Sequence, residues 1–463
     1  MSQPTQTDRP RAAALYESAK KIYPREIDGR FAKLSKLATY SLLGLFYIVP
    51  WLMWDDRQAF LFDLPARKFY LLGLTLWPQD FIYLAWLLMM AAFALFFFTA
   101  LGGRLWCGFA CPQTVWTEAF IWMEQWTEGT RSQRMKLDKA PWTWNKLRRK
   151  GSKQLLWIAF SLWTGFTFVG YFMPIRQLGV DILALNVGGW TLFWGLFYGF
   201  ATYGNAGYMR EQVCKYMCPY ARFQSAMFDH DTLIISYDEQ RGEPRGGRKR
   251  SADRKAEGLG DCIDCHLCVQ VCPTGIDIRD GLQYDCIACA ACIDACDSVM
   301  DKMDYPRGLV RYTTERSMQG EKTRVLRPRM FVYATLLTVL MTALITSMAT
   351  RTPIMLDVIR DRNALYRELP GGLIENIYTV KVINQSNDAR DFHLSVDGVP
   401  GLTLDGVADK FTVKGGAVLS LPVRARTDRK NAYGIMNITF SVTAADDTGV
   451  SVTEDSRFLG PTT

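Results

Sequence analysis

The sequence predicts an α-helical integral membrane protein with a cysteine-rich segment before its last span and an all-β domain at its C-terminus. Three observations carry this prediction. Five long stretches contain no charged residue, all twelve cysteines lie between Cys107 and Cys296, and the residues after Met355 alternate between apolar and polar side chains. Long uncharged stretches are typical of membrane-spanning helices, and period-two alternation is typical of half-buried strands.

Each of the five uncharged stretches is long enough to cross a membrane, because a helix needs about 20 residues to span roughly 30 Å of hydrocarbon. Helices in a soluble core rarely run this far without a charge, so that alternative is disfavoured. The first stretch follows 36 mostly polar residues, which argues against a cleaved signal peptide. The predicted spans are Leu37–Trp54, Phe81–Gly103, Gln154–Ile175, Ile182–Met209 and Met330–Thr350.

The distribution of lysine and arginine predicts the orientation of the spans. Residues 1–36 contain eight of these cations and residues 104–153 contain ten, against three in residues 55–80 and only Arg176 in residues 175–181. Cytoplasmic loops carry the excess of positive charge, so the N-terminus and residues 210–329 are predicted to be cytoplasmic and the chain after Arg351 to be exported. The net charge of +8 is then explained by these loops and does not indicate nucleic-acid binding.

The exported tail is predicted to be a β-sandwich of the immunoglobulin-like type. Alternating segments recur at Tyr378–Val382, Phe392–Val396, Val418–Val423 and Ile438–Val442, separated by Gly and Asp turns. About seven short strands in a hundred residues are typical of such a sandwich.

The cysteine spacing in residues 262–296 is the strongest chemical signal in the chain. A C-x2-C-x2-C-x3-C-P run is followed by a second C-x2-C-x2-C-x3-C run, the pattern of a bacterial two-cluster 4Fe-4S ferredoxin, in which the fourth cysteine of each run binds the other cluster. Zinc sites use two cysteine pairs, and a disulfide framework would place cysteines on the exported side. The predicted ligand sets are Cys262, Cys265, Cys268 and Cys296 for cluster one, and Cys286, Cys289, Cys292 and Cys272 for cluster two.

Two features of this segment need separate comment. Asp297 stands where a proline usually follows the fourth cysteine, which leaves the surroundings of the second cluster open. His266 lies inside the first run, and we interpret it as a bystander because four thiolates are already available.

Two further cysteine pairs, in WCGFACPQ and VCKYMCPY, form Cys-x3-Cys-Pro motifs at the ends of the second and fourth predicted spans. Proline favours the first position of a helix, so Cys111 and Cys218 are predicted to be N-cap residues. A helix N-terminus, with Arg104, Lys215 and Arg222 nearby, would lower the pKa of these thiols. Four thiolates would select copper(I), zinc or an iron-sulfur cluster, and Met217 could add a thioether. The predicted site consists of Cys107, Cys111, Cys214 and Cys218; the alternative is four unliganded thiols.

Other cofactor classes are disfavoured. The three histidines, His230, His266 and His393, all lie outside the predicted spans, so no bis-histidine haem can sit in the bilayer. No G-x-G-x-x-G unit is present, which disfavours a Rossmann-type nicotinamide or flavin site.

These features divide the chain into seven parts. The charged, glycine-rich stretch DEQRGEPRGGRKRSADRKAEGLG cannot bury apolar surface and reads as a linker, although it could also attract lipid headgroups. The parts are a cytoplasmic arm at 1–36, four spans with the first Cys-x3-Cys-Pro motif at 37–209, the second motif with a juxtamembrane helix at 210–237, a flexible linker at 238–260, the ferredoxin domain at 261–329, the fifth span at 330–350 and the exported domain at 351–463.

The motifs GGRLWCGFACPQTVWTE, GYMREQVCKYMCPYARFQSAMFD, GLGDCIDCHLCVQVCPTGIDIRDGLQYDC and CIACAACIDACDSVMDKMDYPRGLVRY together resemble the CcoG (FixG/RdxA) family of oxidase accessory proteins. The resemblance covers nearly the whole chain, with Ala288 and Ala290 where small residues are common in the family. It implies a multi-pass protein of the bacterial inner membrane with a periplasmic C-terminal domain. It also implies reduction of Cu(II) to Cu(I) for the copper centre of a cbb-type cytochrome oxidase, and so partners among oxidase assembly factors and copper transporters or chaperones.

Two alternative functions stay open at this point. One is a quinol-linked membrane ferredoxin, similar to nitrate-reductase maturation subunits that share the Cys-x3-Cys-Pro pairs. The other is a copper chaperone or assembly scaffold with purely structural clusters. Neither the electron donor nor the occupant of the Cys-x3-Cys-Pro site can be read from the sequence.

Overall fold

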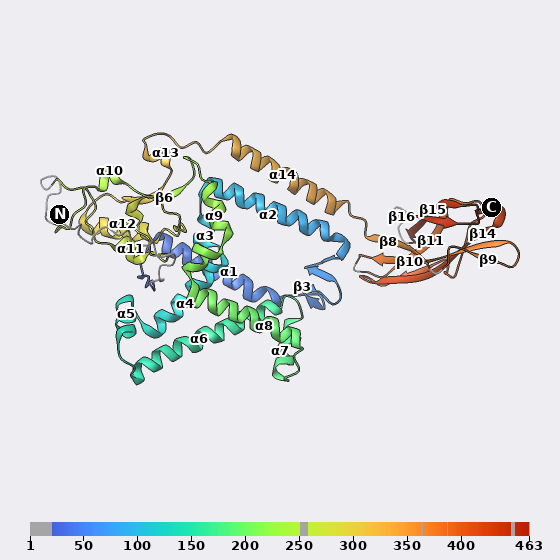
Figure 1. Ribbon diagram of the computed structural model, residues 1–463, viewed down its shortest axis with the longest axis horizontal. Helices are drawn as coiled ribbons and strands as arrows, with labels where there is room; N and C mark the ends of the chain where they lie inside the picture. Colours follow the sequence, from blue (N-terminus) through green and yellow to red (C-terminus); the bar gives the residue numbers. More distant parts are fainter. Residues whose placement is uncertain (1–20, 251–257, 363, 387, 446–449, 463) are drawn as a thin grey trace, which may run out of the picture. The chain divides into compact units, whose positions relative to one another are not determined.

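A computed structural model describes residues 21–250, 258–362, 364–386, 388–445 and 450–462 (Figure 1). The N-terminal half of the predicted arm, residues 1–20, lies outside these ranges. The chain forms two compact units, Met1–Leu340 and Met341–Thr463. The boundary between the two units falls within the last long helix, Pro328–Ala349.

Two of the predicted spans coincide with long apolar helices. Helix α2 covers Phe81–Gly102 and α14 covers Pro328–Ala349, each with 22 residues. In the described part of the chain these are the two helices that are long and apolar enough to cross a membrane. They contact each other through Phe96 and Tyr333, whose ring centroids are 6.5 Å apart.

The other three predicted spans are helical but have different bounds. Helix α1 covers Arg30–Ile48 and α6 covers Trp144–Val169, so each begins earlier and ends earlier than predicted. Their first turns contain lysine and arginine residues. A prediction based on uncharged stretches leaves such turns out, so it places the start of each helix too late. The fourth span is composite: α8 covers Gly189–Thr202 and continues as the π-helix η3, Tyr203–Met209, while residues 182–188 belong to the end of α7, Ile175–Leu183, and a connecting loop. Individually these helices fall short of a span in length or hydropathy.

The remaining elements of this part connect the long helices. Residues 60–76, predicted as a loop, form a three-stranded antiparallel sheet in the order β3-β4-β5. The connecting elements are η1 Val49–Trp51, β1 Met53–Trp54, β2 Arg57–Gln58, β3 Phe60–Asp63, β4 Lys68–Leu71, β5 Leu74–Leu76, η2 Pro78–Asp80, α3 Leu105–Phe109, α4 Pro112–Glu128, α5 Arg131–Lys139, η4 Val213–Met217 and α9 Pro219–Ala226.

The ferredoxin segment is held together by a short strand pair and two helices. Strand β6 pairs antiparallel with β7, and α11 packs against α12. Asp294 on α12 accepts backbone N–H bonds from Phe31 and Ala32, so the first turn of α1 is capped by the ferredoxin segment. The elements are β6 Ile234–Tyr237, α10 Glu239–Gly242, α11 Leu267–Val271, η5 Ile278–Asp280, α12 Ala291–Met303, β7 Val310–Thr313 and α13 Glu315–Met318.

The segment predicted to be a flexible linker, residues 238–260, packs on its neighbours at both ends. Its residues 251–257 lie outside the described ranges, but its two ends pack on the ferredoxin segment. Arg241 forms an ion pair with Asp261 at 2.6 Å, and the N–H of Gly246 donates to the carbonyl of Cys262. Composition alone misled the prediction, because the arginines of this stretch bind carboxylate and carbonyl groups of the neighbouring domain instead of water.

The C-terminal unit is an immunoglobulin-like sandwich, as predicted. One sheet has the order β12-β14-β10-β8 with β9 paired to β10, and the other has the order β13-β11-β15-β16. Tyr378, Phe392, Phe440 and Phe458 are completely buried between the sheets. The strands, more numerous than predicted, are β8 Ile354–Arg360, β9 Arg367–Leu369, β10 Leu373–Asn384, β11 Arg390–Asp397, β12 Thr403–Asp405, β13 Phe411–Val413, β14 Val418–Asp428, β15 Ile435–Ala444 and β16 Ser451–Leu459, with the turn η6 Arg429–Asn431.

Candidate iron-sulfur and thiolate sites

The eight cysteines of the ferredoxin segment surround two small, almost wholly apolar cavities. Each cavity gathers three cysteines from one C-x2-C-x2-C loop and the fourth from the other run, which is the crossed arrangement that the spacing predicts. Cys268 also touches the second cavity and so lies between the two. The first cavity is lined by Cys262, Cys265, Cys268 and Cys296, and the second by Cys272, Cys286, Cys289 and Cys292.

The two cysteine loops share an unusual backbone. In the first loop, Asp264 and His266 on either side of Cys265 have φ angles of 52° and 53°; in the second, Ala288 and Ala290 on either side of Cys289 have φ angles of 56° and 62°. Positive φ is uncommon for residues other than glycine and is retained where the surroundings enforce it. The repetition at matching positions indicates that both loops are bent in the same way around their cavities.

The surroundings of the sulfur atoms fit 4Fe-4S clusters. Burial raises the pKa of Cys268 to about 11 and that of Cys296 to about 12, so these thiols stay protonated at neutral pH unless iron displaces the proton. The backbone N–H of Val310 donates to Cys296 and that of Ala288 donates to Cys286. Buried thiolates that accept backbone N–H bonds are the ligand type that iron-sulfur clusters require.

Two residues singled out in the sequence have other partners. His266 Nδ1 lies 2.8 Å from the Arg279 guanidinium, and His266 Nε2 lies 3.4 Å from Asp264. Asp297 accepts the N–H of Gly308 at 2.9 Å, a bond that ties the end of the second run to the turn before β7.

The Cys-x3-Cys-Pro motifs have the predicted helix-cap geometry. Cys111 is the N-cap of α4 with Pro112 at the first helical position, and Cys218 is the N-cap of α9 with Pro219 at the same position. The other two cysteines lie on short elements just before these caps: Cys107 on α3, and Cys214 on the π-helix η4.

The predicted lowering of the thiol pKa is wrong for Cys111. Burial raises its pKa, although the backbone N–H groups of Gln113 and Thr114 act in the opposite direction. Burial likewise raises the pKa of Cys107 to about 12 and that of Cys214 to about 11, with the nearby thiols adding to the effect. Desolvation therefore outweighs the helix N-terminus and Arg104; the Arg222 side chain lies outside the described part of the structure.

The four motif thiols are neighbours, but they do not converge as ligands of one ion. Each of Cys111, Cys214 and Cys218 acts electrostatically on Cys107, whose thiol donates to Gln224 Oε1 at 3.2 Å. Within the described ranges, no three His, Cys, Asp or Glu side chains come close enough to hold a single metal ion. Occupation of this site by one ion would require the side chains to rotate inward.

Both motifs contact the same loop of the ferredoxin segment, residues 284–289. Arg104 is buried and donates hydrogen bonds to the carbonyls of Tyr284, Cys286 and Ala221. A side chain on Gly108 would meet the carbonyl oxygen of Ala288 at 2.8 Å, so the first motif lies directly on this backbone. The thiolate site and the second cavity are therefore adjacent.

The second motif reaches this loop through an ion pair. Lys215 lies 3.0 Å from Asp285, the residue before Cys286. The sequence identified Lys215 only as a cation near the thiols, because its partner Asp285 lies 70 positions further along the chain.

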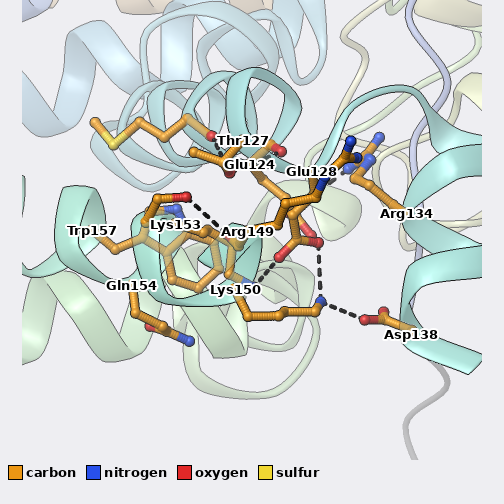
Figure 2. Close-up of polar contacts among 12 residues, drawn as sticks. Glu124, Thr127, Glu128, Arg134, Asp138, Arg149, Lys150, Lys153, Gln154 and Trp157 are labelled. Atoms are coloured by element: carbon orange, nitrogen blue, oxygen red, sulfur yellow. Dashed lines mark hydrogen bonds and ion pairs between the residues drawn. The ribbon is translucent and has the colours of Figure 1, made fainter. Parts of the chain in front are cut away.

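Helix α4 carries two buried carboxylates, Glu124 and Glu128, that lie among cationic side chains (Figure 2). Glu124 on α4 has no exposed surface and pairs with Arg210 at 2.6 Å, and Gln113 at the start of the same helix donates to the Arg210 carbonyl at 3.1 Å. Helix α4 thus joins the first motif to the chain that leads into the second. One turn further, Glu128 pairs with Lys150 and with Lys153 at 3.0 Å each, which fixes α4 to α6.

The fold and the cysteine sites define an iron-sulfur redox protein with a two-cluster ferredoxin segment and an immunoglobulin-like domain. Comparison with family models agrees. Residues 209–315 match a 4Fe-4S dicluster domain, residues 84–129 match a 4Fe-4S binding domain, and residues 344–461 match the immunoglobulin-like fold at the C-terminus of FixG.

Curated relatives place the chain in a family. It is 39% identical over 429 residues to the nitrogen fixation protein FixG of Rhizobium meliloti, covering 84% of this chain and 82% of that protein. It is 42% identical over 406 residues to RdxB of Cereibacter sphaeroides, covering 85% of each, and 38% identical over 459 residues to RdxA of the same organism, covering 96% and 94%. The chain therefore belongs to the FixG/RdxA family.

A solved structure also matches part of the chain. The crystal structure of a FixG-related protein from Vibrio parahaemolyticus is 32% identical, with 24% of this chain and 98% of that chain covered and a TM-score of 0.22. At that TM-score the match carries no structural argument.

Proposed function

We propose that the protein is a membrane-bound cupric reductase, which transfers one electron to Cu(II) and releases Cu(I). The copper would bind at Cys107, Cys111, Cys214 and Cys218. The observation that carries this proposal is the contact of both Cys-x3-Cys-Pro motifs with the loop of residues 284–289, through Arg104, Gly108 and Lys215. This contact gives an electron a short path from the ferredoxin segment to the motif thiols.

In this proposal the ferredoxin cysteines and the motif cysteines have different roles. The two crossed cysteine sets would hold the clusters, which supply one-electron transfer when bound. Thiolate sulfur prefers Cu(I) to Cu(II), so binding at the motif cysteines favours the reduced product. The raised pKa values of Cys107, Cys111 and Cys214 mean that metal binding must displace protons from these thiols.

The proposal includes a five-span topology in the bacterial inner membrane. The N-terminus and the ferredoxin segment would be cytoplasmic and the immunoglobulin-like domain periplasmic, as the distribution of lysine and arginine predicts. The two apolar helices α2 and α14 support at least part of this topology. Reporter fusions at residues 250 and 400 would then lie on opposite sides of the membrane.

The proposed biological role is delivery of reduced copper to the assembly of a cbb-type cytochrome oxidase. Its partners would be membrane lipid, oxidase assembly factors, and a copper transporter or chaperone. Membership of the FixG/RdxA family and the separate C-terminal unit, which offers a docking domain without cysteines, support this role.

A second candidate is electron transfer without copper, with a further 4Fe-4S cluster at the four motif cysteines. The match of residues 84–129 to a 4Fe-4S binding domain favours it, because Cys107 and Cys111 are the two cysteines in that range. A scaffold or chaperone with structural clusters would show no reversible redox signal.

Anaerobic purification followed by reduction and addition of Cu(II) tests the proposal. The reduced protein should convert stoichiometric Cu(II) to Cu(I), detected with a Cu(I)-specific chelator, while its iron-sulfur EPR signal disappears. If the EPR signal persists and no Cu(I) forms, the protein is not a cupric reductase.

A further inference from the structure

A cavity of about 720 Å³ lies between the N-terminal end of α1, helix α4 and the ferredoxin segment. Its wall includes Cys214 of the second Cys-x3-Cys-Pro motif and Cys289 of the second cysteine loop. An occupant of this cavity would therefore lie beside both groups of redox-active thiols. No site derived above uses this space.

We propose that this cavity binds a lipid-borne hydroquinone, which is the two-electron donor for copper reduction. The proposal rests on the proposed function, which requires an electron donor and does not name one. Four features of the cavity carry it: its size and position, the aromatic residues on its wall, the half-buried carboxylate of Glu118, and the exposed aromatic edge at Tyr40.

The size and the wall suit a planar aromatic ring. Pockets for small molecules usually have volumes of about 300–1,000 Å³ and combine apolar walls with a few polar groups. Tyr40 and Trp122 line the cavity with their ring centroids 4.9 Å apart, and Trp126 lies on the same wall. The hydroxyl of Thr117, which accepts a hydrogen bond from Gln113 Nε2 at 3.2 Å, supplies a donor for a ring oxygen.

The carboxylate of Glu118 is placed to accept a proton from the donor. It lies on the cavity wall and accepts a hydrogen bond from Trp122 Nε1 at 3.2 Å. Among the described residues it has no ion-pair partner within salt-bridge distance, in contrast to Glu124 and Glu128 on the same helix. Burial raises the pKa of Glu118, which makes it a better proton acceptor than an exposed glutamate.

The exposed lining of the cavity has a charged part, formed by Arg25, Glu26, Asp28, Lys36 and Lys302, and an aromatic part at Tyr40. A donor from the lipid phase enters at the aromatic part. Tyr40 lines the cavity and is 62% exposed, and Leu37, one turn earlier on α1, is 63% exposed. In the proposed topology this face of α1 meets lipid, so an isoprenoid tail can lie along it while the ring enters the cavity.

The reaction balances without another reagent. One hydroquinone gives one quinone, two electrons and two protons. The two electrons reduce two Cu(II) ions to two Cu(I) ions, and the protons leave through Glu118 to water. The hydroquinone O–H bonds are the bonds that break.

The test compares two reductants on the same anaerobic preparation of the full-length protein. Decylubiquinol must use the donor site. Protein that has been reduced with dithionite and freed of excess reductant before Cu(II) is added already holds its electrons and bypasses that site. The measured quantity is the ratio of the decylubiquinol-driven to the dithionite-driven rate of Cu(I) formation. If the cavity were the entrance for copper instead, a change in its wall would slow both reactions and leave the ratio unchanged.

Two variants alter the cavity in different ways. Ser35→Trp fills the cavity from the side of α1. Glu118→Gln removes the proton acceptor without changing the shape of the cavity. We expect Ser35→Trp to abolish the decylubiquinol-driven reaction, and Glu118→Gln to lower the ratio roughly a hundredfold, the usual effect of losing a general base. Ser41→Trp is the matched control, because Ser41 is exposed on the same helix and does not line the cavity; its ratio should equal that of the wild type.

Photolabelling with an azidoquinone locates the site without relying on activity. Label is expected on peptides from residues 22–40 and 108–126, and excess decylubiquinol and the Ser35→Trp substitution should each prevent it. Label elsewhere, or an unchanged rate ratio in both cavity variants, would overturn the proposal. If wild-type protein reduced no Cu(II) even with dithionite, the proposed function would fail, and the labelling would still decide the quinone site.

Discussion

The guanidinium of Arg104 donates a hydrogen bond to the carbonyl of Cys286 at 3.2 Å. Arg104 lies three residues before Cys107 of the first Cys-x3-Cys-Pro motif, and Cys286 begins the second cysteine loop. This bond joins the two kinds of cysteine site through one buried side chain. Copper chemistry at the motif and electron supply from the ferredoxin segment would be coupled by contacts of this type.

The close approach at Gly108 gives the first prediction. Gly108→Ala places a methyl group 2.8 Å from the backbone oxygen of Ala288, so the motif must move away from the ferredoxin loop. We expect a slower Cu(II) reduction with normal iron content, and a loss of stability of about 1–3 kcal/mol from overpacking. Gly151→Ala is the control, because a side chain there meets nothing within 4 Å, and in a helix it should stabilise by about 0.5–1 kcal/mol. An unchanged reduction rate in Gly108→Ala would show that this contact does not matter for electron transfer.

The crossed cysteine cavities give the second prediction. Cys272→Ser should damage the cluster held by Cys286, Cys289 and Cys292, because Cys272 lines their cavity and not that of its sequence neighbours. Cys296→Ser should damage the other cluster. EPR of the reduced variants measures each loss, and loss of the opposite signal in either variant would show that the assignment is reversed.

The third prediction concerns the buried pair of Glu124 and Arg210. Burial alone would raise the pKa of Glu124, but Arg210, Lys21 and Arg134 hold it below its ordinary value. Glu124→Gln leaves a buried cation without its partner, and we expect a loss of roughly 3–5 kcal/mol in unfolding free energy at neutral pH. The pair of Arg316 with Glu321 is more exposed, so Glu321→Gln should cost no more than about 1 kcal/mol.

The pH dependence of this difference has a definite sign. Because the folded pKa of Glu124 is lowered, its stabilising effect is complete above the unfolded value of about 4.3 and is lost as the pH falls through the folded value. Thermal unfolding in detergent should therefore show a constant gap between wild type and Glu124→Gln near neutral pH that narrows below about pH 4. A gap that stays constant in acid would mean that the charge of Glu124 is not the stabilising feature.

The C-terminal unit gives the fourth prediction. A chain terminated after Thr350 lacks the sandwich but keeps every cysteine and all of the first unit. It should reduce Cu(II) in vitro at the wild-type rate and fail to support oxidase assembly in cells. Loss of copper reduction in truncated protein with intact clusters would place the sandwich in the reductase itself.

Features that depend on residues close together in the sequence could be predicted from it. The spacing of the cysteines was enough to group them around two cavities, two of the five uncharged stretches coincide with α2 and α14, and the alternating segments lie on β10, β11, β14 and β15. In each case the prediction rests on a spacing or a run length in the sequence, and these do not depend on contacts with distant segments.

Features made by distant contacts were not predicted. Glu124 and Arg210 are 86 positions apart, and Arg104 and Cys286 are 182 apart, so no periodicity marks them as partners. The π-helix η3 packs against α4 and the π-helix η4 packs against α9, and neither helix type is marked by the composition of the segment. The pKa of Cys111 was misjudged for the same reason, because its burial depends on other segments.

A double variant tests the copper site at the two Cys-x3-Cys-Pro motifs. Cys111→Ser combined with Cys218→Ser removes the two N-cap thiols, and neither residue lines a ferredoxin cavity. Iron, acid-labile sulfide and copper should be measured on anaerobically purified protein. Cu(II) reduction should be measured with protein that was reduced with dithionite and freed of excess reductant before copper is added. If the motif cysteines bind copper, the iron and sulfide contents of the variant should stay near those of the wild type. Copper retention and Cu(II) reduction should both be abolished. Loss of one further cluster's worth of iron and sulfide, or Cu(II) reduction at the wild-type rate, would contradict copper binding at this site.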